Sequence, residues 1–84
     1  MLFNMEEQKI FLPKYLKCTK TKFNSLLKEA NKLLGFGNEL AQDYCNPIID
    51  KYGNYYFIVN QEVLSLVDYS LCIPFEQIEF ENSL

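Results

Sequence analysis

A short stretch near the middle of the chain, KYGNYYFIVN at residues 51–60, constrains the fold more than any other. Its Gly53-Asn54 pair is typical of a tight hairpin turn, because glycine accepts the positive φ that a type II′ turn needs at its first central position. We therefore expect residues 47–50 and 55–59 to form two antiparallel strands. The pairs that this turn predicts are Tyr52 with Tyr55, Asp50 with Phe57, Ile48 with Val59, Lys51 with Tyr56, and Ile49 with Ile58.

Both faces of this hairpin are apolar away from the turn, so both need cover. The chain has only 84 residues, 49% of them hydrophobic, and a chain of this size buries roughly 60 to 65% of the surface of its unfolded form. We expect one domain spanning residues 1–84, with 1–8 and 81–84 less ordered. A small sheet and few helices would leave some of the tyrosines near the turn exposed.

A long amphipathic helix is predicted within residues 19–37, TKTKFNSLLKEANKLLGFG. Thr19 or Thr21 can cap its start, and Gly35 suits its C-terminal end. Apolar residues at helical spacing form one stripe, while lysines and other polar residues occupy the opposite side. The stripe consists of Phe23, Leu26, Leu27, Ala30, Leu33 and Leu34.

The remaining segments give weaker patterns. We expect a short helix at residues 39–44 after Asn38, and another at 61–70 after Asn60, because asparagine is a good N-cap. Residues 10–16 fit either a strand or a packed irregular arm, of which we favour the strand. PFEQIEFEN at 74–82 favours an edge strand or an ordered tail. The fold class is therefore α+β, with helices on a small antiparallel sheet. Its element order is similar to that of winged-helix proteins, with the hairpin as the wing.

The residue inventory disfavours catalysis and metal binding. The chain has no His and no Arg, so no side chain has an ordinary pKa near neutrality and no rigid fork is present for phosphate or guanine. Cys18, Cys45 and Cys72 lack the spacing of zinc ligands, which favours buried structural thiols in a reducing compartment. We expect no enzyme activity, no cofactor and no metal.

Charge is divided unevenly along the chain. Residues 1–32 hold seven Lys and three Glu, whereas residues 33–84 hold one Lys and eight acidic residues. A lysine cluster at Lys14, Lys17, Lys20 and Lys22 could meet a phosphate backbone, as in a small winged-helix-like DNA-binding regulator. The net charge of −3 and the absence of Arg disfavour nucleic acid as the partner. This DNA-binding hypothesis is therefore the alternative.

The leading hypothesis is a small protein that binds another protein, as an inhibitor, an adaptor or an accessory subunit of a larger assembly. Tyrosines near a turn and acidic residues around aromatic ones are suitable contact groups. The partner would be a second copy of the chain, or a host or virion protein. The predicted contact residues are Tyr52, Tyr55, Tyr56, Phe75, Glu76, Glu79 and Phe80.

Composition also suggests an origin and a location. All eight basic residues are Lys and Asn is frequent, a bias typical of an A+T-rich genome such as that of a virus, phage or mobile element. No apolar stretch reaches the length of a membrane span, and Glu6 and Glu7 disfavour a secretory signal at the N-terminus. We expect a cytoplasmic protein, in the producing cell, in a host cell or within a virion.

Overall fold

The computed structural model describes residues 11–35 and 44–80, which form a small α+β domain and confirm the predicted fold class. The short helix predicted at 39–44 lies outside these residues except for Tyr44, and so do the chain ends 1–8 and 81–84. The elements in chain order are β1 (Lys14–Cys18), α1 (Lys20–Leu34), β2 (Ile48–Ile49), β3 (Tyr55–Val59) and three 3-10 turns, η2 (Gln61–Val63), η3 (Tyr69–Leu71) and η4 (Phe75–Gln77).

The long helix α1 forms as predicted. It begins after Thr19, whose hydroxyl accepts a 3.1 Å hydrogen bond from the N–H of Lys22. It ends at Gly35, which has a φ of 92° and donates its N–H to the carbonyl of Asn31. The buried side chains come from the predicted apolar stripe and are Phe23, Leu26 and Ala30.

The sheet is antiparallel with strand order β1-β3-β2. The predicted N-terminal strand is confirmed, although it begins only after Pro13. Along β1 and β3 the pairs run from Lys14 with Val59 to Cys18 with Tyr55. On the other edge of β1, the backbone of Tyr15 pairs with Ile73. The C-terminal part of the chain therefore enters the fold beside β1.

The predicted hairpin register is wrong. In the structure Ile48 pairs with Tyr56 and Ile49 with Tyr55, and the N–H of Asp50 donates to the carbonyl of Asn54. The loop therefore has three residues, 51–53, and not the two of a type II′ turn. Gly53 has a positive φ of 88°, which a three-residue hairpin loop requires at this position. The strand predicted at 47–50 is only two residues long.

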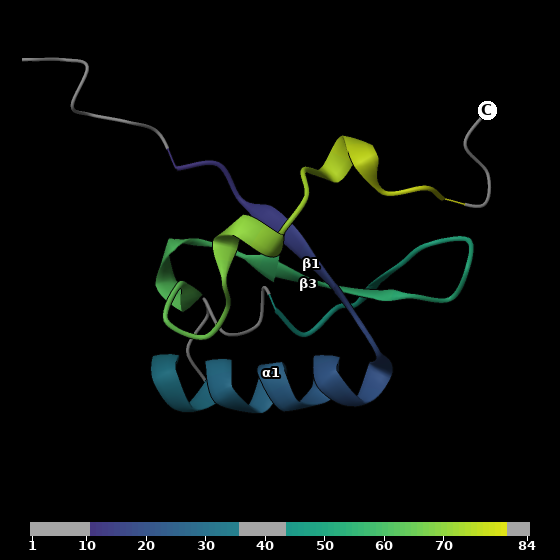
Figure 1. The fold of residues 1–84 in the computed structure, drawn as a ribbon. Coiled ribbons are helices and arrows are strands. Elements are labelled where there is room, and N and C mark those ends of the chain that lie inside the picture. The colour runs from purple at the N-terminus through teal and green to yellow at the C-terminus, as the bar shows by residue number, and fades with distance from the viewer. Residues whose placement is uncertain (1–10, 36–43, 81–84) are drawn as a thin grey trace, which may run out of the picture.

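The two faces of the sheet are covered by different parts of the same chain. In Figure 1, α1 lies below the sheet and the yellow C-terminal segment lies above it. Phe57 and Val59 of β3 are fully buried on the α1 side with Phe23. Tyr56 faces the other side and is also buried. The central strand therefore leaves little apolar surface uncovered, contrary to the expectation from its two apolar faces.

Two further predictions for the C-terminal half are wrong. Residues 61–70 form no continuous helix, because Asp68 is extended and its carboxylate accepts hydrogen bonds from the N–H and hydroxyl of Ser70. Such local bonds compete with helix formation. Residues 74–80 form the turn η4 and an extended segment, and not an edge strand. The alternative expectation of an ordered tail is confirmed for 74–80, because Ile78 is buried.

Candidate protein-binding site

The three tyrosines predicted as contacts have different environments. Tyr52 is exposed at the hairpin tip, where its hydroxyl lies 3.3 Å from Oε1 of Glu79 and its ring lies 5.3 Å from the ammonium group of Lys51. Tyr55 is half-buried against Phe23. Tyr56 is buried, so it presents no surface to a partner. The tyrosines therefore form no common contact surface.

Tyr56 instead belongs to a hydrogen-bond network around Asp50. Burial acts to raise the pKa of Asp50, but bonds from the N–H of Asn54, the Tyr56 hydroxyl, the Asn54 side chain and the N–H of Tyr52 outweigh it and lower the pKa to about 2. Burial and the neighbouring Asp50 raise the pKa of Tyr56 to about 12. The network satisfies a buried carboxylate, which indicates a structural role.

The predicted contact residues of the C-terminal segment, unlike the three tyrosines, lie together at one surface. Phe75 contacts the rings of Tyr15 and Phe80, at centroid distances of 5.6 Å and 5.5 Å. Even so, 48% of Phe75 is exposed. Glu76 and Glu79 are exposed beside it. Glu79 forms a 3.2 Å ion pair with Lys51, which links this segment to the hairpin tip.

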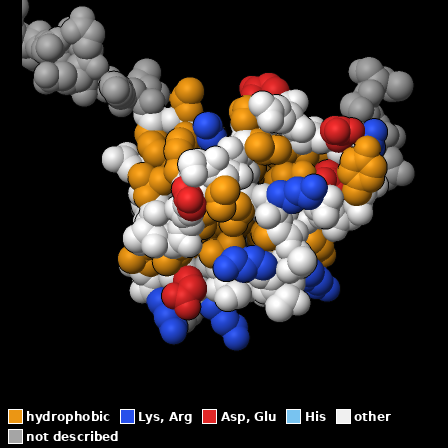
Figure 2. All heavy atoms as spheres, in the orientation of Figure 1, with side chains coloured by type: hydrophobic (Ala, Val, Ile, Leu, Met, Phe, Trp, Pro, Cys, Tyr) orange, Lys and Arg blue, Asp and Glu red, His pale blue; other side chains and the backbone are white. Residues whose placement is uncertain are grey.

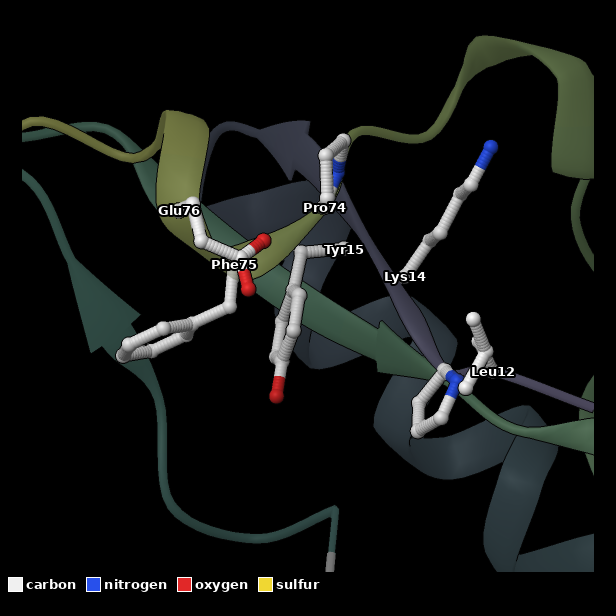
Figure 3. Close-up of a pocket in the computed structure, with 7 residues that line it drawn as sticks. Leu12, Lys14, Tyr15, Pro74, Phe75 and Glu76 are labelled. Atoms are coloured by element: carbon white, nitrogen blue, oxygen red, sulfur yellow. The ribbon is translucent and has the colours of Figure 1, made fainter.

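A cavity of about 310 Å³ opens next to Phe75, between residues 12–15 and residues 74–76. We call it the 12–15/74–76 groove. Figure 3 shows the Tyr15 ring standing between Phe75 on one side and Leu12 on the other. The backbone pairing of Tyr15 with Ile73 holds the two walls together. The groove is therefore part of the folded sheet and not a gap between loose segments.

The groove is mainly apolar with a few polar groups at its rim. Leu12 is 66% exposed, and its carbonyl accepts a hydrogen bond from the Tyr69 hydroxyl. The ammonium group of Lys14 lies 4.9 Å from the centre of the Tyr69 ring. Glu76 lies on the opposite wall. An apolar recess with a few placed polar groups is typical of binding sites.

Sequence reasoning found one wall of this groove and missed the other. Phe75 and Glu76 were predicted as contacts, whereas Leu12, Pro13 and Tyr15 were not. These residues come together only because β1 pairs with Ile73, a contact between distant parts of the chain. The one local signal was the apolar character of residues 11–16 around Pro13, which we interpreted as a strand.

The lysines of the DNA-binding hypothesis do not form one surface. Side chains three residues apart on a strand point to opposite faces, so Lys14 and Lys17 of β1 diverge. Lys20 and Lys22 are exposed on the first turn of α1. Figure 2 shows lysines gathered along α1, at the lower edge of the molecule. No predicted nucleic-acid residue except Lys14 lines the 12–15/74–76 groove.

The cysteines occupy three environments. Cys72 is buried in the core and Cys18 is half-buried, and burial raises the pKa of both thiols. Cys45 is exposed, so its predicted burial is wrong. Within residues 11–35 and 44–80, no group of three His, Cys, Asp or Glu side chains is placed to hold a metal ion. In the same part of the chain no helix is long and apolar enough to cross a membrane.

The chain was compared with known proteins by sequence and by structure. No protein-family model, curated protein or solved structure matches it.

Proposed function

We propose that the protein acts by binding another protein, as an inhibitor, an adaptor or an accessory subunit, and that the 12–15/74–76 groove is the contact surface. The observation that carries this proposal is the position of Phe75. Its ring contacts two other aromatic rings, yet about half of the residue is exposed to solvent. Aromatic side chains in such positions are frequent anchors of protein interfaces.

The packing around Phe75 makes a contact there favourable. A side chain that is already fixed in one orientation loses little conformational entropy on binding. Leu12 and Phe75 flank the Tyr15 ring along one cavity, so a partner segment laid across this ring would remove apolar surface of all three residues from water. Tyr52 is more exposed than Phe75, but it lies at the hairpin tip and is not among the residues that line the 12–15/74–76 groove.

The charge near the groove favours a partner with a basic residue close to its apolar anchor. Glu76 is exposed on the groove wall and makes no hydrogen bond or ion pair with the described residues. The ammonium group of Lys14 already lies against the Tyr69 ring. The chain as a whole carries a net charge of −3. A partner cation at Glu76 would add orientation and speed of association more than affinity.

The test compares variants of the full chain that differ at matched positions. Phe75 and Leu33 have the same exposed fraction, 48%, but Leu33 lies on α1, across the sheet from the groove. The chain is immobilised and exposed to extract from its source cell, and retained proteins are identified by mass spectrometry. We expect a protein that wild type and Leu33→Ala retain, and that Phe75→Ala and Leu12→Asp lose.

The same variants test whether the partner is a second copy of the chain. The mass of purified wild type and of each variant is measured by light scattering after gel filtration. An oligomer that Leu12→Asp converts to a monomer, and Leu33→Ala does not, identifies the partner as another copy. The proposal would be contradicted if the wild type is a monomer and retains no protein whose binding depends on Phe75. Circular dichroism confirms that each variant is folded.

A further inference from the structure

We propose that the 12–15/74–76 groove binds a short proline-containing segment of its partner in the polyproline II conformation, with a Lys or Arg beside it. This inference rests on the proposed function and specifies the partner. Proteins recognise peptide segments by adding a strand to a sheet edge, by holding a helix in a groove, or by docking a polyproline II segment on aromatic residues. The groove favours the third mode.

Strand addition is blocked at this edge of the sheet. The N–H of Tyr15 donates to the carbonyl of Ile73 at 2.8 Å, and the N–H of Ile73 donates to the carbonyl of Tyr15 at 2.9 Å. These bonds use the outward backbone groups of β1 at the groove. Pro13 and Pro74 have no N–H to offer. An incoming strand would therefore find no ladder of donors and acceptors along the groove walls.

A helix fits the lining of the groove less well than an extended segment does. Two turns of helix are about 11 Å long and, with side chains, about 10 Å across. The cavity measures about 310 Å³ and is bounded by only four residues on one side and three on the other. Lys14 and Glu76 lie among these residues, so the groove presents no continuous apolar strip for helix side chains at i, i+3, i+4 and i+7.

A polyproline II segment matches the shape and the lining. It has three residues per turn and rises about 3.1 Å per residue, so it is slender and needs no partner for its own N–H groups. Its flat proline rings pack well on aromatic and proline surfaces, and the groove is lined by Pro13, Tyr15, Pro74 and Phe75. Figure 3 shows the Tyr15 ring between Phe75 and Leu12, where it would lie between two prolines on the same face of the segment.

The polar groups of the groove also fit such a segment. The carbonyl groups of a polyproline II chain have no internal hydrogen bonds and accept from donors on the binding protein. The Tyr15 hydroxyl is such a donor, since none of the described residues forms a hydrogen bond with it. The Glu76 carboxylate is the matching site for a Lys or Arg of the segment.

The experiment uses three immobilised pools of peptides of equal length, each with one Arg. The first has two prolines separated by two varied residues, the second has alternating β-branched residues, and the third is rich in Ala and Leu and forms helices. The full chain is passed over each pool and the bound fraction is measured. We expect the proline pool to retain at least about tenfold more protein than either other pool, a preference equivalent to about 1.4 kcal/mol.

Three substitutions test the assigned contacts. Tyr15→Phe removes only the hydroxyl, and Glu76→Gln removes only the charge, so each should weaken retention about two- to fivefold. Glu29→Gln is the matched control for the charge, because Glu29 lies exposed on α1, across the sheet. The Glu29→Gln protein should be retained as strongly as wild type. Replacing Arg by Gln in the proline pool should reduce retention as Glu76→Gln does.

Preferential retention on the strand or helix pool would overturn the inference, and so would retention on the proline pool that Leu12→Asp leaves unchanged. Absence of retention on all three pools would also overturn it. The proposed function is tested separately by the cellular protein that depends on Phe75. If that protein is found and the proline pool fails, the groove is a protein-binding site with a different kind of partner. If both fail, both proposals are wrong.

Discussion

The Tyr56 hydroxyl donates a 2.8 Å hydrogen bond to Oδ2 of Asp50, and this bond ties the central strand to the hairpin tip. The same carboxylate accepts from the N–H of Tyr52 and from the N–H and side chain of Asn54. One buried side chain therefore closes the three-residue loop and sets the register of β2 against β3. The Lys51 N–H then donates to the carbonyl of Glu79, which places the C-terminal segment.

The first prediction concerns this network. Asp50→Asn replaces an acceptor oxygen by an NH₂ group, so the Tyr56 hydroxyl and the Asn54 side chain could no longer both donate to this position. We expect a clearly lower midpoint of urea unfolding, measured by circular dichroism. Tyr56→Phe removes only one bond, and it should lower the free energy of unfolding by about 1 to 2 kcal/mol. An Asp50→Asn protein as stable as wild type would contradict a structural role for the carboxylate.

Stability should also depend on pH through Asp50. Its pKa is about 2 in the folded protein, below the ordinary value of 3.8. The folded state therefore gains stability from the ionised carboxylate above about pH 4, and loses it as the pH falls towards 2. We expect the unfolding midpoint of wild type to drop over this range, and to drop less in Asp50→Asn. The difference between the two proteins measures the contribution of the Asp50 carboxylate.

Local sequence patterns predicted those helices and strands that are determined by residues close together in the sequence. The helix α1 depends on an apolar stripe, a Thr19 cap and Gly35, all within one stretch of sequence, and it forms as expected. Strand β3 was predicted from its β-branched and aromatic residues. The register was not, because Gly53-Asn54 fits both a two-residue and a three-residue loop. The choice depends on the bonds that the Asp50 side chain makes, and these cannot be read from spacing.

Local sequence patterns also could not predict which residues cover the second face of the sheet. The alternation in PFEQIEFEN suggested a strand, but Pro74 lacks an N–H and only Ile73, the residue before it, pairs with β1. Residues 75–80 cross the sheet as the turn η4 followed by an extended segment. Two residues of the groove, Phe75 and Glu76, were predicted as contact residues, but the groove itself was not predicted. The groove depends on Tyr15, which is brought to Phe75 by this single long-range pairing.

Gly53 should tolerate side chains poorly. Its φ is 88°, a region that residues with a Cβ rarely adopt, although no atom lies within 4 Å of the position that a Cβ would take. The cost of Gly53→Ala is therefore conformational and should be about 1 to 2 kcal/mol in the free energy of unfolding. Gly53→Asn should cost less, because Asn enters this region more readily. Equal stability of the Ala, Asn and wild-type proteins in urea unfolding would contradict the observed loop.

The C-terminal segment should contribute to the stability of the whole domain. Ile78 is buried, and both it and Tyr56 lie outside the main core cluster, on the side of the sheet away from α1. Ile78→Ala should therefore lower the free energy of unfolding by about 2 to 4 kcal/mol, through lost burial and a cavity. Leu71→Ala is the matched control, because Leu71 is 67% exposed and its truncation should change the free energy by less than about 0.5 kcal/mol. If both variants unfold in urea at the wild-type midpoint, residues 74–80 do not cover the sheet. If only Ile78→Ala is destabilised, the second apolar face is buried by the chain itself. Residues 74–76, which form one wall of the groove, then belong to a segment that is packed on the sheet.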